Sequence, residues 1–358
     1  MHIPDGYLSP STCAVLYAGA AAGWYVALRR LKRVLLTRVI PLISVFAAFS
    51  FVVMMFNLPL PGGTTGHALG VTIAAIVLGP SGAILALSIA LAIQALFFGD
   101  GGISTLGANC FNMAIVGSLV AYGAYRLMSA RAAVGDRRRI IAAGIAGYVA
   151  VNAAALCAAM EFGIQPMLFH DASGTPLYAP YRLGVAIPAM MIGHLTFAGM
   201  AEAVISAGIV AYLQVADPAL LSRSLTLSYT SLVGAAKLRP VASSTRRLWI
   251  AVAMLMLLTP LGILAAGTAW GEWSPAELAR GASSRAAAVR SLRPEAPSGM
   301  QRLSHLWTAP FPAYAPAFVR SRGFGYLLSA MFGVGLLLCL SLAAQRVLER
   351  QRRRRAAA

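Results

Sequence analysis

The sequence predicts an all-α polytopic membrane helix bundle, and three observations support this fold class. Hydrophobic residues make up 59% of the 358 residues. The mean hydropathy of +0.73 is too high for a soluble globular domain. The apolar residues also gather in runs, most of which are long enough for a helix to cross a bilayer. We place nine such runs, at about residues 11–28, 38–57, 67–79, 81–98, 105–128, 139–160, 186–213, 248–268 and 324–345.

The third run is short for a lone span, and it meets the fourth at Gly79-Pro80-Ser81-Gly82. We therefore expect these two runs to be either two separate spans, or else a hairpin or a partly re-entrant pair.

The basic residues favour an orientation with the N-terminus outside and the C-terminus in the cytoplasm. In this orientation 21 of the 29 Lys and Arg residues lie in inward-facing segments, as the positive-inside rule requires. Seven of the other eight lie in one long segment at about 270–322, where length weakens the rule. The net charge of +18 is thus explained by topology, and no nucleic-acid partner is expected.

The character of the chain changes after about residue 217. Residues 1–217 hold seven runs and are expected to form one membrane domain. The polar segment 218–247 is expected to be a cytoplasmic linker. Residues 248–358 hold two further runs, an external loop between them and a basic tail, and they predict a second module.

The first six residues, Met1-His2-Ile3-Pro4-Asp5-Gly6, offer a candidate metal site. The Met1 amine, the His2 backbone nitrogen and the near ring nitrogen of His2 are spaced to close two fused chelate rings on one ion. A square-planar set of four nitrogens suits Ni(II) and Cu(II), and His67 could supply the fourth. The predicted topology places both histidines on the outer side.

A histidine at position 2 is usually a disordered residue without a ligand role, but two features favour the chelate. Pro4 and Gly6 predict a tight turn. No cleavable signal peptide is recognisable, and the large His2 side chain should protect Met1 from removal, so we expect the amine to persist.

Two polar residues stand out in the seventh run. Glu202 lies near its middle, where a charge costs about 2.5–3.5 kcal/mol, and should face the bundle interior. His194 lies eight residues earlier on nearly the same helical face. Gating or support of the metal site is one role for them, and an interior hydrogen-bonded pair is the other.

Three polar residues are candidates for anchoring a metal-bound imidazole, whose second nitrogen normally needs an acceptor. Asn109 and Asn112 share one helical face near the outer surface, and Asp5 follows the N-terminal histidine. Spacing alone does not choose among them.

Several strings together resemble one family: Met1 to Gly6, Gly62 to His67, Gly107 to Ala114, and Gly193-His194 with Ala201-Glu202. They are similar to the CbiM/NikM substrate-capture (S) components of energy-coupling-factor transporters for cobalt and nickel, over about residues 1–215. The resemblance implies a seven-helix S component in which the Met1 amine, the His2 amide and imidazole, and the His67 imidazole hold the ion. It implies a CbiQ-like transmembrane T component and CbiO-like ATPase subunits as partners. Residues from about 248 resemble the two-span N component, fused to the same chain.

The expected function is therefore the substrate-binding subunit of an ATP-dependent importer of Co(II) for cobalamin biosynthesis, in the plasma membrane. Ni(II) uptake by the same mechanism is the alternative, and a proton-driven metal permease acting through His194 and Glu202 is a second class. The chain has no Gly-x-x-x-x-Gly-Lys-[Ser/Thr] string, so partner subunits are expected to hydrolyse ATP. It also lacks His-Glu-x-x-His, and neither an enzyme activity nor a permanent cofactor is expected.

Overall fold

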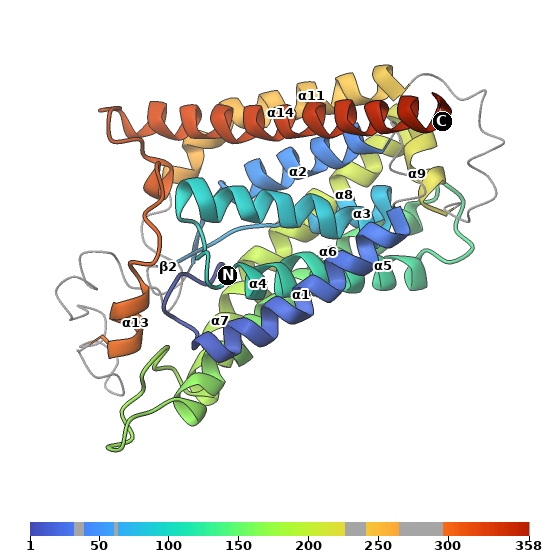
Figure 1. The fold of residues 1–358 in the computed structure, drawn as a ribbon. Coiled ribbons are helices and arrows are strands. Elements are labelled where there is room, and N and C mark those ends of the chain that lie inside the picture. Colours follow the sequence, from blue (N-terminus) through green and yellow to red (C-terminus); the bar gives the residue numbers. More distant parts are fainter. Residues whose placement is uncertain (32–38, 61–63, 226–240, 265–295, 358) are drawn as a thin grey trace.

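The computed structural model describes residues 1–31, 39–60, 64–225, 241–264 and 296–357, which form a bundle of long helices (Figure 1). Within this part of the chain, seven helical stretches are long and apolar enough to cross a membrane. Their bounds are Pro10–Leu31, Val71–Phe98, Leu106–Met128, Arg137–Leu168, Leu183–Ala216, Arg246–Leu264 and Arg322–Gln351. The shorter apolar helix α2 (Ile40–Met54) packs among them. The predicted all-α polytopic membrane fold is confirmed.

Three of the long stretches contain π-helical turns. The elements are α1 (Pro10–Leu31), α3 (Val71–Ile93) with η1 (Gln94–Phe98), α4 (Leu106–Asn109) with η2 (Cys110–Val116) and α5 (Gly117–Met128), α6 (Arg137–Leu168), and α7 (Leu183–Gly193) with η3 (His194–Ala198) and α8 (Gly199–Ala216). Two of these turns contain residues singled out by the sequence, Asn112 in η2 and His194 in η3.

The predicted third and fourth runs form one element that is broken at Gly79. The backbone of Gly79 is not helical, with φ 73° and ψ 169°, and Pro80 follows it. His67 and Asp100, which flank this element, both contact His2. A straight helix of 28 residues would separate its ends by about 42 Å, so the chain must reverse.

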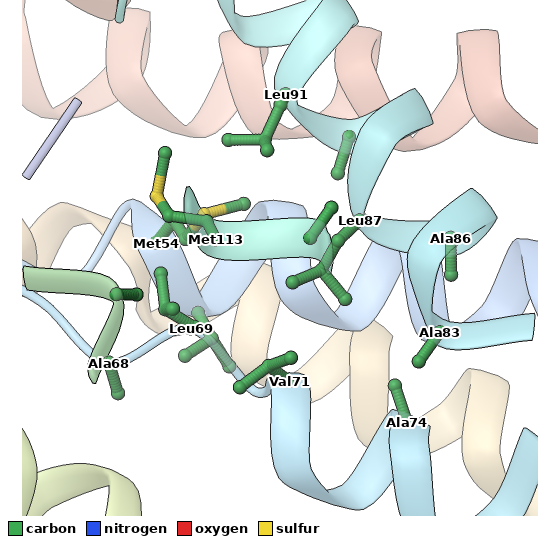
Figure 2. Packing of buried hydrophobic residues seen from close by; sticks show 14 of the residues in the cluster. Met54, Ala68, Leu69, Val71, Ala74, Ala83, Ala86, Leu87, Leu91 and Met113 are labelled. Carbon is green, nitrogen blue, oxygen red and sulfur yellow. The ribbon is translucent and has the colours of Figure 1, made fainter. Parts of the chain in front are cut away.

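The two runs therefore form a helical hairpin that turns at Gly79. Figure 2 shows its two arms, with Val71 and Ala74 on one and Ala83, Leu87 and Leu91 on the other. The first arm is short, and its N-terminal end lies inside the bundle, where Val71 and Leu69 are fully buried.

A small β-hairpin leads the chain from α2 to this arm. Strand β1 (Leu58–Leu60) pairs antiparallel with β2 (Thr64–Gly66), and His67 follows directly. Behind His67 the chain packs on buried apolar side chains, with Leu69 close to Met54 and Met113 (Figure 2). The histidine is thus held on a short, buried connection rather than on an exposed loop.

The C-terminal helices lie against α2. Helices α11 (Val241–Leu258) and α14 (Arg322–Ala357) run beside it along one face of the bundle (Figure 1). The Tyr326 hydroxyl donates a hydrogen bond to the Met55 carbonyl at 2.8 Å. Two short elements lie between α11 and α14 in the sequence, α13 (Ser298–Leu303) and η5 (Pro312–Tyr314). They cover the end of the bundle that holds the N-terminus.

Parts of the predicted linker and external loop lie outside the described residues. The predicted linker, 218–247, begins with α9 (Pro218–Leu225) and ends in α11, and its residues 226–240 are not described. Residues 265–295 of the predicted external loop are also outside the described part.

Candidate metal centre

The N-terminal segment is buried in the bundle rather than extended into solvent. Met1 is 5% exposed, His2 is 7% exposed and Ile3 is fully buried. Figure 1 shows the N-terminus inside the molecule, next to α4 and β2. A chelate that uses the Met1 amine and reaches His67 requires this placement.

Asn109 at the end of α4 holds the N-terminal segment by its backbone. The Ile3 N–H donates to Asn109 Oδ1 at 2.8 Å, and Asn109 Nδ2 donates to the Ile3 carbonyl at 3.0 Å. The Gly102 N–H donates to the same carbonyl at 2.9 Å, as does the Thr105 hydroxyl. These bonds satisfy the buried peptide groups of Ile3, which would otherwise oppose burial.

Asp5 ties the segment to the loop that follows α3 and η1. Its carboxylate accepts the N–H groups of Ile103 and Ser104 at 3.1 and 2.7 Å. Gly102 makes the approach possible, because a Cβ at this position would lie 2.3 Å from the Asp5 nitrogen. Asp5 and Asn109 thus fix the chain directly after His2, at residues 3 and 5.

Glu202 fixes the segment that carries His67. Its carboxylate, fully buried in α8, accepts the N–H groups of Leu69 and Gly70, each at 2.8 Å, and that of Thr72 at 3.3 Å. These N–H groups belong to the start of α3, where a helix has unpaired donors and a positive dipole end. The left-handed backbone of Gly70, with φ 67°, turns the chain into the helix.

The rings of His2 and His67 are in contact edge to face, with centroids 5.0 Å apart and planes at 64°. Nitrogen ligands lie about 2 Å from a transition metal, so two on one ion are at most about 4 Å apart. Rings at this separation can meet that condition. The Nε2 atom of His2 is buried and has no hydrogen-bond partner among the described residues.

The Nδ1 atom of His2 faces Asp100. It lies 3.2 Å from the Asp100 carbonyl oxygen and 3.4 Å from carboxylate Oδ1. The predicted chelate uses this same nitrogen, so it requires the ring to make a half-turn about its Cβ–Cγ bond. His67 Nδ1 lies 3.1 Å from the Ala68 carbonyl, which leaves its Nε2 as the ligand atom.

Asp100 is held in turn by the C-terminal part of the chain. The Tyr314 hydroxyl donates to Asp100 Oδ2 at 2.6 Å, and Gln94 Nε2 donates to the Tyr314 oxygen at 2.9 Å. Burial and the Asp100 charge raise the pKa of Tyr314 well above its usual value, so the hydroxyl stays protonated. The Tyr314 ring stacks on Phe98 at 4.7 Å.

Both imidazoles are in the form that binds metals. Burial lowers the pKa of His67 to about 3, and the nearby His2 and N-terminal amine act in the same direction. Burial also lowers the pKa of His2, although Asp100 opposes it. Neutral rings at pH 7 can offer a lone pair without first losing a proton.

The predicted anchoring residues have other partners. Asp5 and Asn109 hold the N-terminal backbone, and Asn112 Nδ2 donates to Glu161 Oε2 at 2.8 Å. Among the described residues, none of the three has a hydrogen bond to an imidazole. The acceptor beside His2 is Asp100, which the sequence did not single out.

His194 and Glu202 have separate partners. His194 Nδ1 lies 2.8 Å from the Met190 carbonyl, within its own helix, and its Nε2 has no partner among the described residues. The π-helical turn at His194–Ala198 changes the helical phase between the two residues. No hydrogen bond joins them in the described structure.

Side chains of His, Cys, Asp and Glu form no group of three or more that could hold a metal ion, among the residues described. The candidate set has two imidazoles, from His2 and His67, and takes its other two nitrogens from the backbone of residues 1 and 2.

Comparison with known families assigns the chain. The model of the CbiM family, described as the cobalt uptake substrate-specific transmembrane region, matches residues 2–220. The chain belongs to the CbiM family. A second model, the PDGLE domain, matches residues 244–350.

Relatives of this CbiM-family chain are named as metal transport proteins. It is 53% identical over 343 residues to the fused nickel transport protein NikMN of Rhodobacter capsulatus, covering 94% of this chain and 95% of that protein. It is 40% identical to the probable fused nickel transport protein LarMN of Lactiplantibacillus plantarum, over 95% of this chain and 96% of that one. A crystal structure of a transition metal transporter matches with TM-score 0.58 and 51% identity, covering 64% of this chain and all of the other. The predicted family, and a transporter rather than an enzyme, are confirmed.

Proposed function

We propose that the chain is the metal-capturing membrane subunit of an energy-coupling-factor importer for a divalent transition metal. The ion is bound by the Met1 amine, the His2 backbone nitrogen and imidazole, and the His67 imidazole. This assignment is supported by one observation above all: the N-terminus is buried, with His2 packed against His67.

Capture depends on two segments that are held before the ion arrives. Asn109 and Asp5 fix the N-terminal segment, and Glu202 fixes the segment after His67. The ligands are therefore brought together by side chains that do not bind the ion themselves. Because the segments are already ordered, less conformational entropy is lost on binding than a flexible N-terminal segment would lose.

Nickel is the ion that the observations favour, in place of the cobalt expected from the sequence. A set of four nitrogens suits Ni(II), and a given site of this kind generally binds Ni(II) more tightly than Co(II). The two fused relatives, which align along almost the whole chain, are both named nickel transport proteins. Metal analysis of the purified protein after growth with each ion supplied alone tests the choice, with more nickel than cobalt expected at equal supply.

The ion is delivered inward with energy from partner subunits, a CbiQ-like T component and CbiO-like ATPases. The chain lies in the plasma membrane with its N-terminus external and its C-terminus cytoplasmic. Residues 1–217 form the capture domain, and 248–358 form an attached N-component-like module. Uptake of radioactive nickel by cells that express all subunits should stop when the ATPase catalytic lysine is replaced, while the purified chain still binds the ion.

A proton-driven permease is the second candidate. It is supported only by Glu202 and His194, two buried titratable side chains in one helical stretch. Proteoliposomes that contain this chain alone decide between the two. Nickel uptake driven by an imposed pH gradient, and lost in His194→Gln, would favour the permease over the multi-subunit importer.

A further inference from the structure

A second polar site lies at the opposite end of the bundle from His2 and His67. The connection between α5 and α6, residues 129–136, is separated from the start of α4 by a helical stretch of 23 residues, roughly 35 Å long. From Arg126 to Arg139 the chain carries five arginines and one acidic residue, Asp136. The positive-inside rule accounts for a basic connection at this end, but it does not account for the burial of one of its arginines.

Three of these arginines line a cavity of about 450 Å³. Arg126 comes from the last turn of α5, Arg131 from the connection and Arg139 from the first turn of α6. Arg131 has a left-handed backbone, with φ 63°. The cavity is partly open, and its lining also includes Ser129.

Arg139 is the residue that requires an explanation. Its side chain is only 1% exposed, and it is one of the largest fully buried side chains of the protein. Its Nε donates to the Ala132 carbonyl at 3.2 Å, but its Nη1 has no partner among the described residues. A buried guanidinium cannot lose its proton, so without an anion it would leave an uncompensated charge.

Among the described residues, no ion pair joins a carboxylate to Arg139. Asp136 caps α6 by accepting the Arg138 N–H at 2.9 Å, and no ion pair joins it to Arg139 in the described structure. Residues 32–38 and 226–240, which follow α1 and α9 in sequence, contain no Asp or Glu. An anion bound in the cavity would supply the counter-charge that no described ion pair gives to Arg139.

We propose that this cavity binds the phosphate group of an anionic lipid headgroup, held by Arg139 with Arg126 and Arg131. Arginine is suited to phosphate because its planar fork can donate two parallel hydrogen bonds. Basic pockets between membrane helices at the cytoplasmic side are known to take such headgroups. In the proposed orientation this end faces the cytoplasmic leaflet, and only the choice of leaflet rests on the proposed function.

Native mass spectrometry of the purified full chain tests the proposal. The chain is titrated with phosphatidylglycerol, with phosphatidylcholine, and with phosphatidylglycerol in the presence of inorganic phosphate. Arg131→Gln and Arg139→Gln are compared with Arg137→Gln, a matched control that is exposed on the same helix start but does not line the cavity. Because Arg131 is exposed, Arg131→Gln keeps the test valid if Arg139→Gln fails to fold.

One phosphatidylglycerol is expected to bind more tightly than phosphatidylcholine. Its affinity should fall about fivefold in Arg131→Gln, the effect of one basic residue at an anionic surface, and should change less in Arg137→Gln. If millimolar inorganic phosphate displaces phosphatidylglycerol, the arginines bind free phosphate and not a lipid headgroup, and the proposal is wrong about the ligand. Equal losses in Arg131→Gln and Arg137→Gln, or no preference for the anionic lipid, would overturn the proposal. Metal binding plays no part in these measurements, so they are independent of the transport assignment.

Discussion

The side-chain amide of Asn109 holds the peptide groups of Ile3 on both sides. It accepts from the Ile3 N–H at 2.8 Å and donates to the Ile3 carbonyl at 3.0 Å. The next residue toward the N-terminus is His2, so a side chain from α4 sets the position of the proposed ligands. A terminal segment that would be flexible in most proteins is thereby part of the buried core.

Replacing Asn109 by alanine should release the N-terminal segment. A buried peptide group left without its partner costs about 1–3 kcal/mol, so nickel affinity should fall between about fivefold and about 150-fold. Isothermal titration calorimetry of the purified variant measures the loss. Asn112→Ala is the matched control, because Asn112 lies one turn further along and bonds to Glu161 instead. Equal losses in both variants would contradict this role of Asn109.

Replacing Glu202 by glutamine should displace the His67 segment. The carboxylate accepts three backbone N–H groups, and a glutamine would turn an NH₂ group toward at least one of them. We expect nickel affinity to fall by at least about tenfold, because hydrogen bonds to a charged group contribute about 1.5–3 kcal/mol. Ser206→Ala, one turn later on the same helix, removes a buried hydroxyl without a described partner and should keep wild-type affinity. Wild-type affinity in Glu202→Gln would refute the role.

The Tyr314→Phe variant should strengthen nickel binding through Asp100. It removes the hydroxyl that donates to Asp100 Oδ2 and leaves the carboxylate free to turn away from His2. The chelate needs His2 Nδ1 to leave Asp100, so a weaker contact with Asp100 lowers the cost of turning the ring, and nickel affinity should rise by up to about tenfold. Tyr326→Phe, whose hydroxyl bonds to the Met55 carbonyl, provides the comparison and should bind nickel normally. The opposite ranking of the two variants would show that Asp100 does not transmit the effect.

Acid should loosen the His67 segment in the metal-free protein. The unfolded imidazole has a pKa near 6.5, and burial lowers that of His67 to about 3. Stability from the neutral buried ring is therefore complete above pH 6.5 and declines as the pH falls toward 3, by up to about 1.4 kcal/mol per unit.

Hydrogen exchange measures this loss. The amides of Leu69, Gly70 and Thr72, corrected for intrinsic rates, should lose protection between pH 6.5 and 4.5. Buried amides in the middle of α6 serve as the reference. Unchanged protection of the three amides relative to that reference would contradict the linkage.

The sequence was sufficient for the fold class, the positions of most spans and the family. Long apolar runs and basic clusters carry that information locally, because a helix in lipid must satisfy its own backbone. The hairpin at Gly79 was one of two stated alternatives. Which one occurs depends on where its two ends pack, and that is decided by contacts between His2, His67 and Asp100.

The supporting residues were found only in part. Asn109, Asp5 and Glu202 were singled out as polar residues near the site, but their partners are backbone groups, which leave no mark in the sequence. Asp100 and Tyr314 were missed as a pair because 214 residues separate them. An acidic residue in the glycine-rich turn 99–102, on the same predicted side as His2, was the available signal.

The central claim, that the first amino group of the chain is itself a ligand, is tested most directly by adding one glycine before Met1. The extension converts the Met1 amine into a peptide nitrogen and leaves both imidazoles in place, and nickel binding by the purified protein is then measured by calorimetry. We predict that high-affinity binding is lost, while a tag of the same size at the C-terminus has no effect. Nickel affinity unchanged by the added glycine would contradict the claim.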